Sequence, residues 1–151
     1  MKLWPVMLCA LFAISTIGCG DEEVVYNPDS LYPENWQSTY VKKKACAKSP
    51  THGGDYVEVW VSPDAEAAFD DRSIAMPMGG VLLKPQFTDD GCTEPAGFTA
   101  MRPDSTGADG KIVWYWQRAE INGDLPTNGP STTDFCASCH NGCAGGICST
   151  P

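Results

Sequence analysis

Alternation of apolar and polar positions in the middle of the chain predicts an antiparallel sheet. Residues 55–62 place Val57, Val59 and Val61 on one face, which is typical of a half-buried strand. Three further strands are predicted, over residues 81–84, 98–102 and 111–120. The last of these strands carries aromatic side chains on both faces, as expected of a central strand or one that faces a cofactor.

Helical patterns are expected before and between the first strands. A helix is predicted over residues 34–47, where apolar positions share one face. A shorter helix is expected after Ser62, which would cap it with Pro63 in the first turn. These patterns predict a mainly β (α+β) fold, a small antiparallel sheet with one or two helices near the start.

Proline and glycine mark the breaks in this pattern. Pro85 lacks an N–H group, so the strand over residues 81–84 is expected to end there or to lie at an edge of the sheet. Residues 122–134 are rich in Gly, Pro, Asn and Thr, which predicts an irregular connection.

The N-terminal segment indicates export. Lys2 precedes an apolar run over residues 3–14, which is typical of a signal peptide and too short to cross a bilayer. Ile17-Gly18-Cys19 resembles the lipobox of bacterial lipoproteins, and the resemblance implies a lipid on Cys19. The expected organisation is a signal peptide over 1–18, a lipidated tether over 19–33 and a single domain over 34–151.

Charge narrows the expected partners. The formal net charge is −9, so we expect no binding to nucleic acid or to anionic lipid through charge. The lipid on Cys19 would hold the protein to a membrane, and a periplasmic redox protein is a candidate partner. Gly20 after Cys19 favours the outer membrane, facing the periplasm.

The strongest motif is Cys136-Ala137-Ser138-Cys139-His140. Two cysteines separated by two residues can bond to two vinyl groups of one porphyrin, and the following histidine can ligate the iron. We therefore predict one covalent haem c on Cys136 and Cys139, with His140 as the iron ligand. The alternatives are a zinc site that adds Cys143 and Cys148, and a knot of disulfides.

Cleavage before Cys19 would leave seven of the eight cysteines in the mature chain. Four of these remain once Cys19 carries a lipid and Cys136 and Cys139 carry haem. An even remainder in an oxidising compartment indicates two disulfides. The preferred pairs are Cys46 with Cys92 and Cys143 with Cys148, while other pairings stay open on the sequence alone.

A haem motif that follows an antiparallel sheet resembles the cytochrome P-460 family and its sibling, cytochrome c′-beta. The resemblance covers residues 34–140 and rests on five segments in order: Ser49–Gly54 leading into Val57–Val61, Met76–Lys84, Phe98–Arg102, Trp114–Trp116 and Phe135–His140. It implies a mostly β, often dimeric haem protein with an open distal side.

The two branches of that family differ at one lysine. Cytochromes P-460 carry a bond between a lysine and a porphyrin meso carbon and oxidise hydroxylamine, whereas the c′-beta branch lacks that bond and binds nitric oxide or carbon monoxide. Lys84 stands at the position of this lysine, although Pro85 replaces the acidic residue that usually follows. An amine bonds to carbon only when neutral, so Lys84 would need an apolar site that lowers its pKa.

The expected function is redox chemistry or binding of small nitrogen species, such as hydroxylamine or nitric oxide, at an open iron site. A hydroxylamine-type oxidoreductase would also need a base, for which Glu58 and Glu120 are candidates.

The first alternative is a lipid-anchored electron carrier with a sixth iron ligand. Candidates for that ligand are His52, Met76, Met78 and Met101, although a turn histidine is also typical of a structural hydrogen bond. The second alternative is a disulfide-rich lipoprotein without haem.

Overall fold

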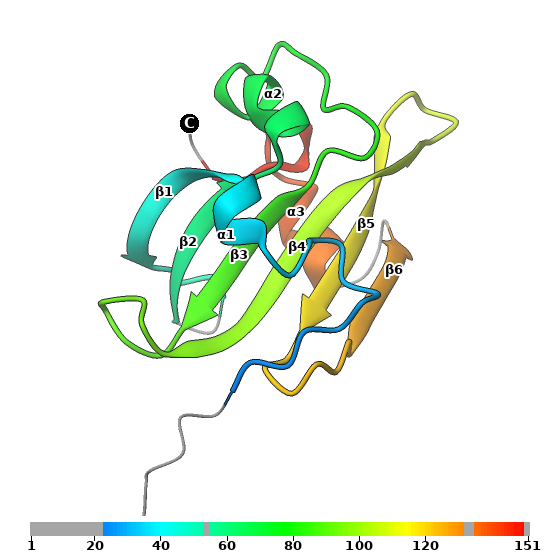
Figure 1. Cartoon of the computed structure of the whole chain (residues 1–151). Coiled ribbons are helices and arrows are strands. Elements are labelled where there is room, and N and C mark those ends of the chain that lie inside the picture. The colour runs from blue at the N-terminus through cyan, green and yellow to red at the C-terminus, as the bar shows by residue number, and fades with distance from the viewer. Residues whose placement is uncertain (1–22, 53–54, 132–134, 150–151) are drawn as a thin grey trace, which may run out of the picture.

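The computed structural model describes residues 23–52, 55–131 and 135–149. Within them the chain forms a six-stranded sheet whose strands follow sequence order, with every neighbouring pair antiparallel (Figure 1). The strands are β1 (Val41–Lys48), β2 (Tyr56–Val61), β3 (Leu82–Phe87), β4 (Pro95–Thr106), β5 (Ile112–Ala119) and β6 (Thr127–Ser131). The helices are α1 (Trp36–Thr39), α2 (Glu66–Asp70) and α3 (Phe135–His140), with short 3-10 turns η1 (Pro63–Ala65) and η2 (Ala144–Gly146). The predicted mainly β fold is confirmed.

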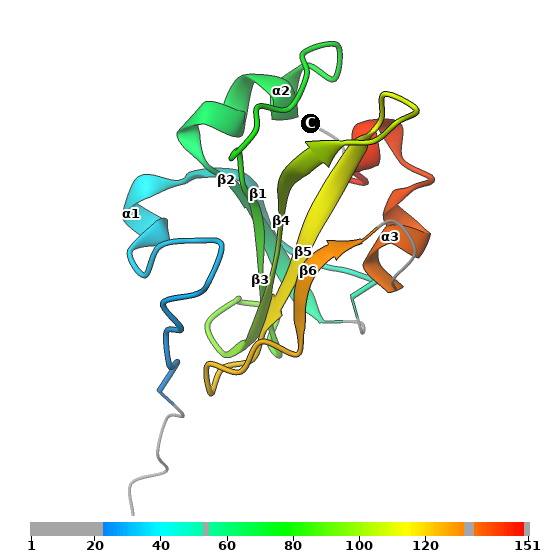
Figure 2. The same cartoon turned by 90° about the vertical axis from the view of Figure 1, so that its right-hand side faces the viewer.

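Both faces of the sheet are covered, because side chains alternate along each strand. Leu82 and Leu83 are neighbours on β3, yet they are buried in different core clusters. Viewed along its edge, the sheet has α1 on one side and α3 with the C-terminal segment on the other (Figure 2). We call these sides the α1 face and the α3 face. The core of the α1 face contains Tyr32, Trp36, Trp60, Leu83, Phe98, Ala100 and Ala119. The core of the α3 face contains Val59, Val61, Phe69, Leu82, Met101, Trp114, Trp116, Ala137 and Ile147.

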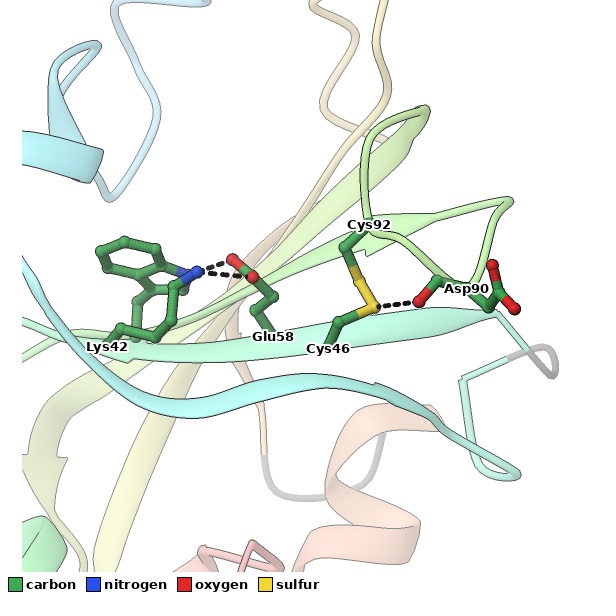
Figure 3. A network of polar contacts seen from close by, with 6 residues as sticks. Lys42, Cys46, Glu58, Asp90 and Cys92 are labelled. Atoms are coloured by element: carbon green, nitrogen blue, oxygen red, sulfur yellow. Dashed lines mark hydrogen bonds and ion pairs between the residues drawn. A yellow bond between two sulfur atoms is a disulfide. The ribbon is translucent and has the colours of Figure 1, made fainter.

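The predicted helix over residues 34–47 is wrong, because α1 ends at Thr39 and β1 begins at Val41. The Lys42 ammonium lies 2.6 Å from Glu58 on the paired strand β2 (Figure 3). The neighbouring Lys43 contacts Glu66 and Asp70 near α2, at 3.1 and 2.7 Å. The backbone pairing of β1 with β2, to which these ion pairs add, therefore outweighs the local helical pattern.

Pro85 lies inside β3, between β2 and β4, so the prediction that it ends the strand or marks an edge is wrong. It pairs with Phe98 of β4. On the other side, the pairs with β2 fall at Leu83 and Gln86, on either side of Lys84 and Pro85. The missing N–H of proline thus coincides with an interruption of one ladder.

The connection over residues 122–134 also differs from its prediction. Residues Thr127–Ser131 form β6, which pairs with β5 at the edge of the sheet. Pro130 is tolerated in this strand because one side of an edge strand needs no ladder hydrogen bond.

Both predicted disulfides are confirmed. Cys46 of β1 is joined to Cys92 in the connection between β3 and β4 (Figure 3). Cys143 is joined to Cys148, only five positions later, and so closes a short loop after α3.

The predicted signal peptide over 1–18 and the lipidated Cys19 lie outside the described residues. Part of the predicted tether over 19–33, however, packs against the sheet. The amide of Val25 donates to the carbonyl of Ile121 at 2.7 Å, and the Leu31 amide donates to the side chain of Gln117 at 2.7 Å. Tyr32 is buried, because its ring fills the α1 face. Among the described residues, no helix is long and apolar enough to span a membrane.

Candidate functional site

A cavity of about 580 Å³ lies between the α3 face and the C-terminal segment. This volume falls within the range of about 300–1,000 Å³ that is typical of small-molecule and cofactor sites. Its lining combines strands β3, β4 and β5 with α3, the Cys143–Cys148 loop and the turn between β1 and β2. The cavity therefore joins segments that are far apart in the sequence.

The floor of the cavity is formed by two rows of side chains that cross the sheet. Cross-strand pairing places Lys84 beside Thr99 and Thr99 beside Arg118. The second row runs in the same way through Leu82, Met101 and Trp116. All six residues line the cavity, because residues two positions apart on a strand share a face. Alternation in the sequence indicated which side chains share a face of the sheet. The two cross-strand rows could not be predicted, because they depend on the register between strands.

The helix α3 presents both cysteines of the haem motif to this cavity. Cys136 and Cys139 are three positions apart, so they lie on neighbouring turns of one helix face. Both remain as thiols. Ala137 lies between them with no exposed surface and packs in the core of the α3 face, which fixes the side of the helix that faces the cavity.

His140 ends α3 and is held by two contacts. Its Nδ1 lies 2.7 Å from the carbonyl oxygen of Gly146, and its ring centroid lies 4.8 Å from that of Trp116, edge to face. A carbonyl can only accept, so Nδ1 carries the proton and Nε2 keeps its lone pair. Burial lowers the pKa of His140, the Gly146 contact opposes this, and the positive charge of Lys84 lowers it further. The neutral ring suits metal ligation.

His52 reaches the same cavity from the turn between β1 and β2. Its Nδ1 lies 2.8 Å from the hydroxyl oxygen of Ser49, which is buried. Burial, followed by the positive charges of Lys84 and His140, lowers the pKa of His52 to about 4. His52 is therefore neutral at pH 7, and both roles predicted for it remain compatible with its position.

Lys84 projects to the cavity from the middle of the sheet. Burial lowers the pKa of its amine, as expected where the charged form loses hydration. Among the ion pairs of the described residues, none includes Lys84. The site thus favours the neutral amine that the predicted bond to porphyrin would require.

Several other candidates lie elsewhere. Of the three methionines only Met101 lines the cavity, since Met76 is buried in the core and Met78 is exposed. The candidate bases do not line it either: Glu58 pairs with Lys42, and Glu120 pairs with Arg118. The carboxylate that does line it is Asp55. Asp55 is the first residue of the strand predicted over residues 55–62 and belongs to no motif, so no signal in the sequence singled it out.

The zinc alternative loses two of its ligands, because Cys143 and Cys148 form a disulfide. In the described parts of the chain, no three His, Cys, Asp or Glu side chains gather as a metal-binding group. A haem iron held through one histidine requires no such group.

The sequence matches no family model, and no curated protein matches it. The resemblance to cytochrome P-460 and cytochrome c′-beta therefore stays a prediction.

Proposed function

We propose that this protein is a c-type haem protein that binds or transforms a small nitrogen-containing or diatomic ligand. One observation carries the proposal: the thiols of Cys136 and Cys139 and the imidazole of His140 line one cavity of about 580 Å³. These are the groups that attach and ligate a haem c. When bound, the haem would supply an iron able to change oxidation state and to bind a small ligand.

The residues of the cavity fit this group. Two thiols on neighbouring turns are available for the thioether bonds. His140 keeps Nε2 for the iron, since Nδ1 is engaged by Gly146. The walls of the cavity are mainly apolar, which suits a porphyrin and limits water near the iron.

On the ligand side, His52 and Lys84 are the groups that can handle protons. Both line the cavity, and the pKa of each lies below its ordinary value. A neutral imidazole can accept a proton from a hydroxylamine-like substrate, and the hydroxyl of Ser49 at 2.8 Å supports either tautomer. We therefore assign the base to His52 in place of Glu58 or Glu120.

A second function has an observation of its own. His52 and Met101 both line the cavity, and either side chain is a known type of sixth iron ligand. If one of them occupies that position, the protein is a six-coordinate electron carrier that resists external ligands.

The test uses a Cys19→Ser form, produced in a host that matures c-type haem. We expect one covalent haem for each chain. Carbon monoxide should bind rapidly to the ferrous form, because no protein side chain has to leave the iron. The matched control is Cys136→Ser/Cys139→Ser, which should carry no covalent haem. Ferrous iron that does not bind carbon monoxide would favour the six-coordinate electron carrier. A chain without haem, while a control cytochrome matures in the same cells, would overturn the proposal.

The presence or absence of a Lys84–porphyrin bond distinguishes hydroxylamine oxidation from gas binding. A Lys84–porphyrin bond would shift the ferrous Soret band to the red and would link haem to the peptide that contains Lys84. Both signs must disappear in Lys84→Met. Haem linked only to the peptide of Cys136 and Cys139 would assign the protein to gas binding and exclude the crosslink.

The proposal also includes a location. We infer a lipid on Cys19 that holds the domain at the periplasmic side of the outer membrane, where an exported redox protein can dock. Membrane fractions should contain the wild-type protein and lack the Cys19→Ser form. Equal amounts of both forms in the membrane would contradict the anchor, and cross-linking at low concentration would detect the dimer that the family resemblance implies.

A further inference from the structure

The loop closed by Cys143 and Cys148 packs against the α3 face through Gly146 and Ile147. Inside the loop, the Gly146 amide donates to the carbonyl of Cys143 at 3.0 Å. Ile147 is buried in the core of the α3 face. Just after the loop, the guanidinium of Arg72 donates to the carbonyl of Ser149 at 2.7 Å. A disulfide, a core side chain and a cation thus fix the path of the backbone.

Gly146 is the most constrained position of this loop. Its φ of +77° lies in the left-handed region, which side-chain-bearing residues rarely adopt. A Cβ atom at this position would also overlap the indole nitrogen of Trp114. Glycine is therefore required by the backbone conformation and by the close approach to Trp114 together.

The same residue supplies the carbonyl oxygen that His140 contacts through Nδ1, at 2.7 Å. The second contact of this ring, with Trp116, leaves the ring little freedom to rotate. The position of the Gly146 carbonyl therefore determines both which nitrogen of His140 is protonated and the direction in which Nε2 points.

We propose that the Cys143–Cys148 loop is a positioning element that orients His140 through the carbonyl of Gly146 and lowers the reduction potential of the iron. The inference rests on the proposed haem function. An imidazole that donates to a carbonyl is a stronger electron donor to its metal. Stronger donation stabilises the ferric iron relative to the ferrous iron, so loss of the contact should raise the potential.

Two loop variants test this inference, each with a matched control. Gly146→Ala displaces the carbonyl, and its control is Gly110→Ala, where φ is also +77° but no atom lies within 4 Å of the added Cβ. Cys143→Ser/Cys148→Ser opens the loop, and its control is Cys46→Ser/Cys92→Ser, which removes the other disulfide.

The measurement is the reduction potential of the haem-loaded protein. We expect both loop variants to shift the equilibrium about tenfold toward ferrous iron, a rise of ~59 mV for one electron. The iron–histidine vibration of the ferrous form should move to lower frequency, because the bond from His140 weakens. Both controls should keep the wild-type values.

The outcomes separate the two proposals. If a loop variant carries haem with an unchanged potential and an unchanged iron–histidine vibration, the positioning role is wrong while the haem function stands. If Gly146→Ala does not fold, the double cysteine variant decides alone. If the wild-type protein carries no haem, the proposed function fails and the inference fails with it.

Discussion

The two histidines of this chain line one cavity, but their partners differ. His140 directs Nδ1 to a carbonyl oxygen of Gly146, whereas His52 directs Nδ1 to the hydroxyl of Ser49. A carbonyl only accepts a hydrogen bond, while a hydroxyl can donate or accept. His140 is therefore confined to one tautomer, as a metal ligand should be, and His52 can exist in either. The hydrogen-bond partner of each ring, more than its burial, separates the ligand role proposed for His140 from the proton-transfer role proposed for His52.

The two rings are also anchored differently. His140 is followed by the short Cys143–Cys148 loop, which lies on the cavity. His52 lies in a turn closed by the Ser49 amide, which donates to the carbonyl of Asp55 at 2.8 Å. That turn extends β1, which the Cys46–Cys92 disulfide ties to the connection after β3 (Figure 3). The local disulfide Cys143–Cys148 closes the loop that contacts His140, and the long-range disulfide Cys46–Cys92 holds the strand that leads to His52.

Exchange of each histidine for alanine should give the largest difference between them. His140→Ala should abolish the iron–histidine vibration of the ferrous protein, and imidazole added to the solution should restore ligation. His52→Ala should keep the vibration, because this ring is not the proximal ligand. Resonance Raman spectra of the two ferrous variants provide the measurement. Survival of the vibration in His140→Ala, with loss in His52→Ala, would reverse the assignment of the two rings.

The two disulfides should differ in their effect on stability. Loop-closure entropy predicts about 4 kcal/mol for Cys46–Cys92, which spans 46 positions, and about 2 kcal/mol for Cys143–Cys148, which spans five. Guanidinium unfolding of Cys46→Ser/Cys92→Ser and Cys143→Ser/Cys148→Ser measures both values. A larger loss for the short loop would mean that its contacts in the folded state outweigh the entropy term.

Local patterns in the sequence predicted four of the six strands, β2 to β5. The alternation through Val57, Val59 and Val61 indicated β2, and the even number of remaining cysteines indicated two disulfides, although not their pairing. Residues 34–47 were predicted wrongly because the chain from Val41 onward pairs with β2, and the carboxylate partners of Lys42 and Lys43 also lie in distant segments. A local helical pattern contains no information about such partners.

The cavity could be predicted only in part, for a similar reason. The Cys136–His140 motif predicts His140 as a ligand from adjacent residues alone. The approach of His52 depends on the turn that follows β1, and the row through Lys84 and Thr99 depends on the register of β3 with β4. The contact with Gly146 depends on a left-handed backbone. None of these features follows from the periodicity of one segment.

Ser49→Ala tests how much the Ser49 hydroxyl stabilises the position of the His52 ring. Loss of the hydroxyl leaves Nδ1 of a partly buried ring without this 2.8 Å contact, which should cost about 1 kcal/mol of unfolding free energy. Thr51, whose hydroxyl lies 3.3 Å from the same nitrogen, provides the matched variant Thr51→Val. We expect a smaller loss for Thr51→Val in the same guanidinium titration. Equal losses would show that the two hydroxyls share the ring.

The last comparison concerns the pH dependence of stability that His52 contributes. Its pKa of about 4 in the folded protein lies below the ordinary value of 6.5, so between these values the unfolded chain binds more protons than the folded protein. Stability from this group is therefore fully present above pH 6.5 and is lost as the pH falls toward 4.

His52→Gln removes this titration and leaves the other groups in place. If the protein carries haem as proposed, His140 ligates the iron and does not titrate, so the difference between wild type and His52→Gln reports on His52 alone. Unfolding free energies at pH 4.5 and 7 should fall closer together in the variant than in the wild type. A wild-type slope that persists unchanged in His52→Gln would show that His52 titrates at its ordinary pKa, and that the cavity does not exclude its proton.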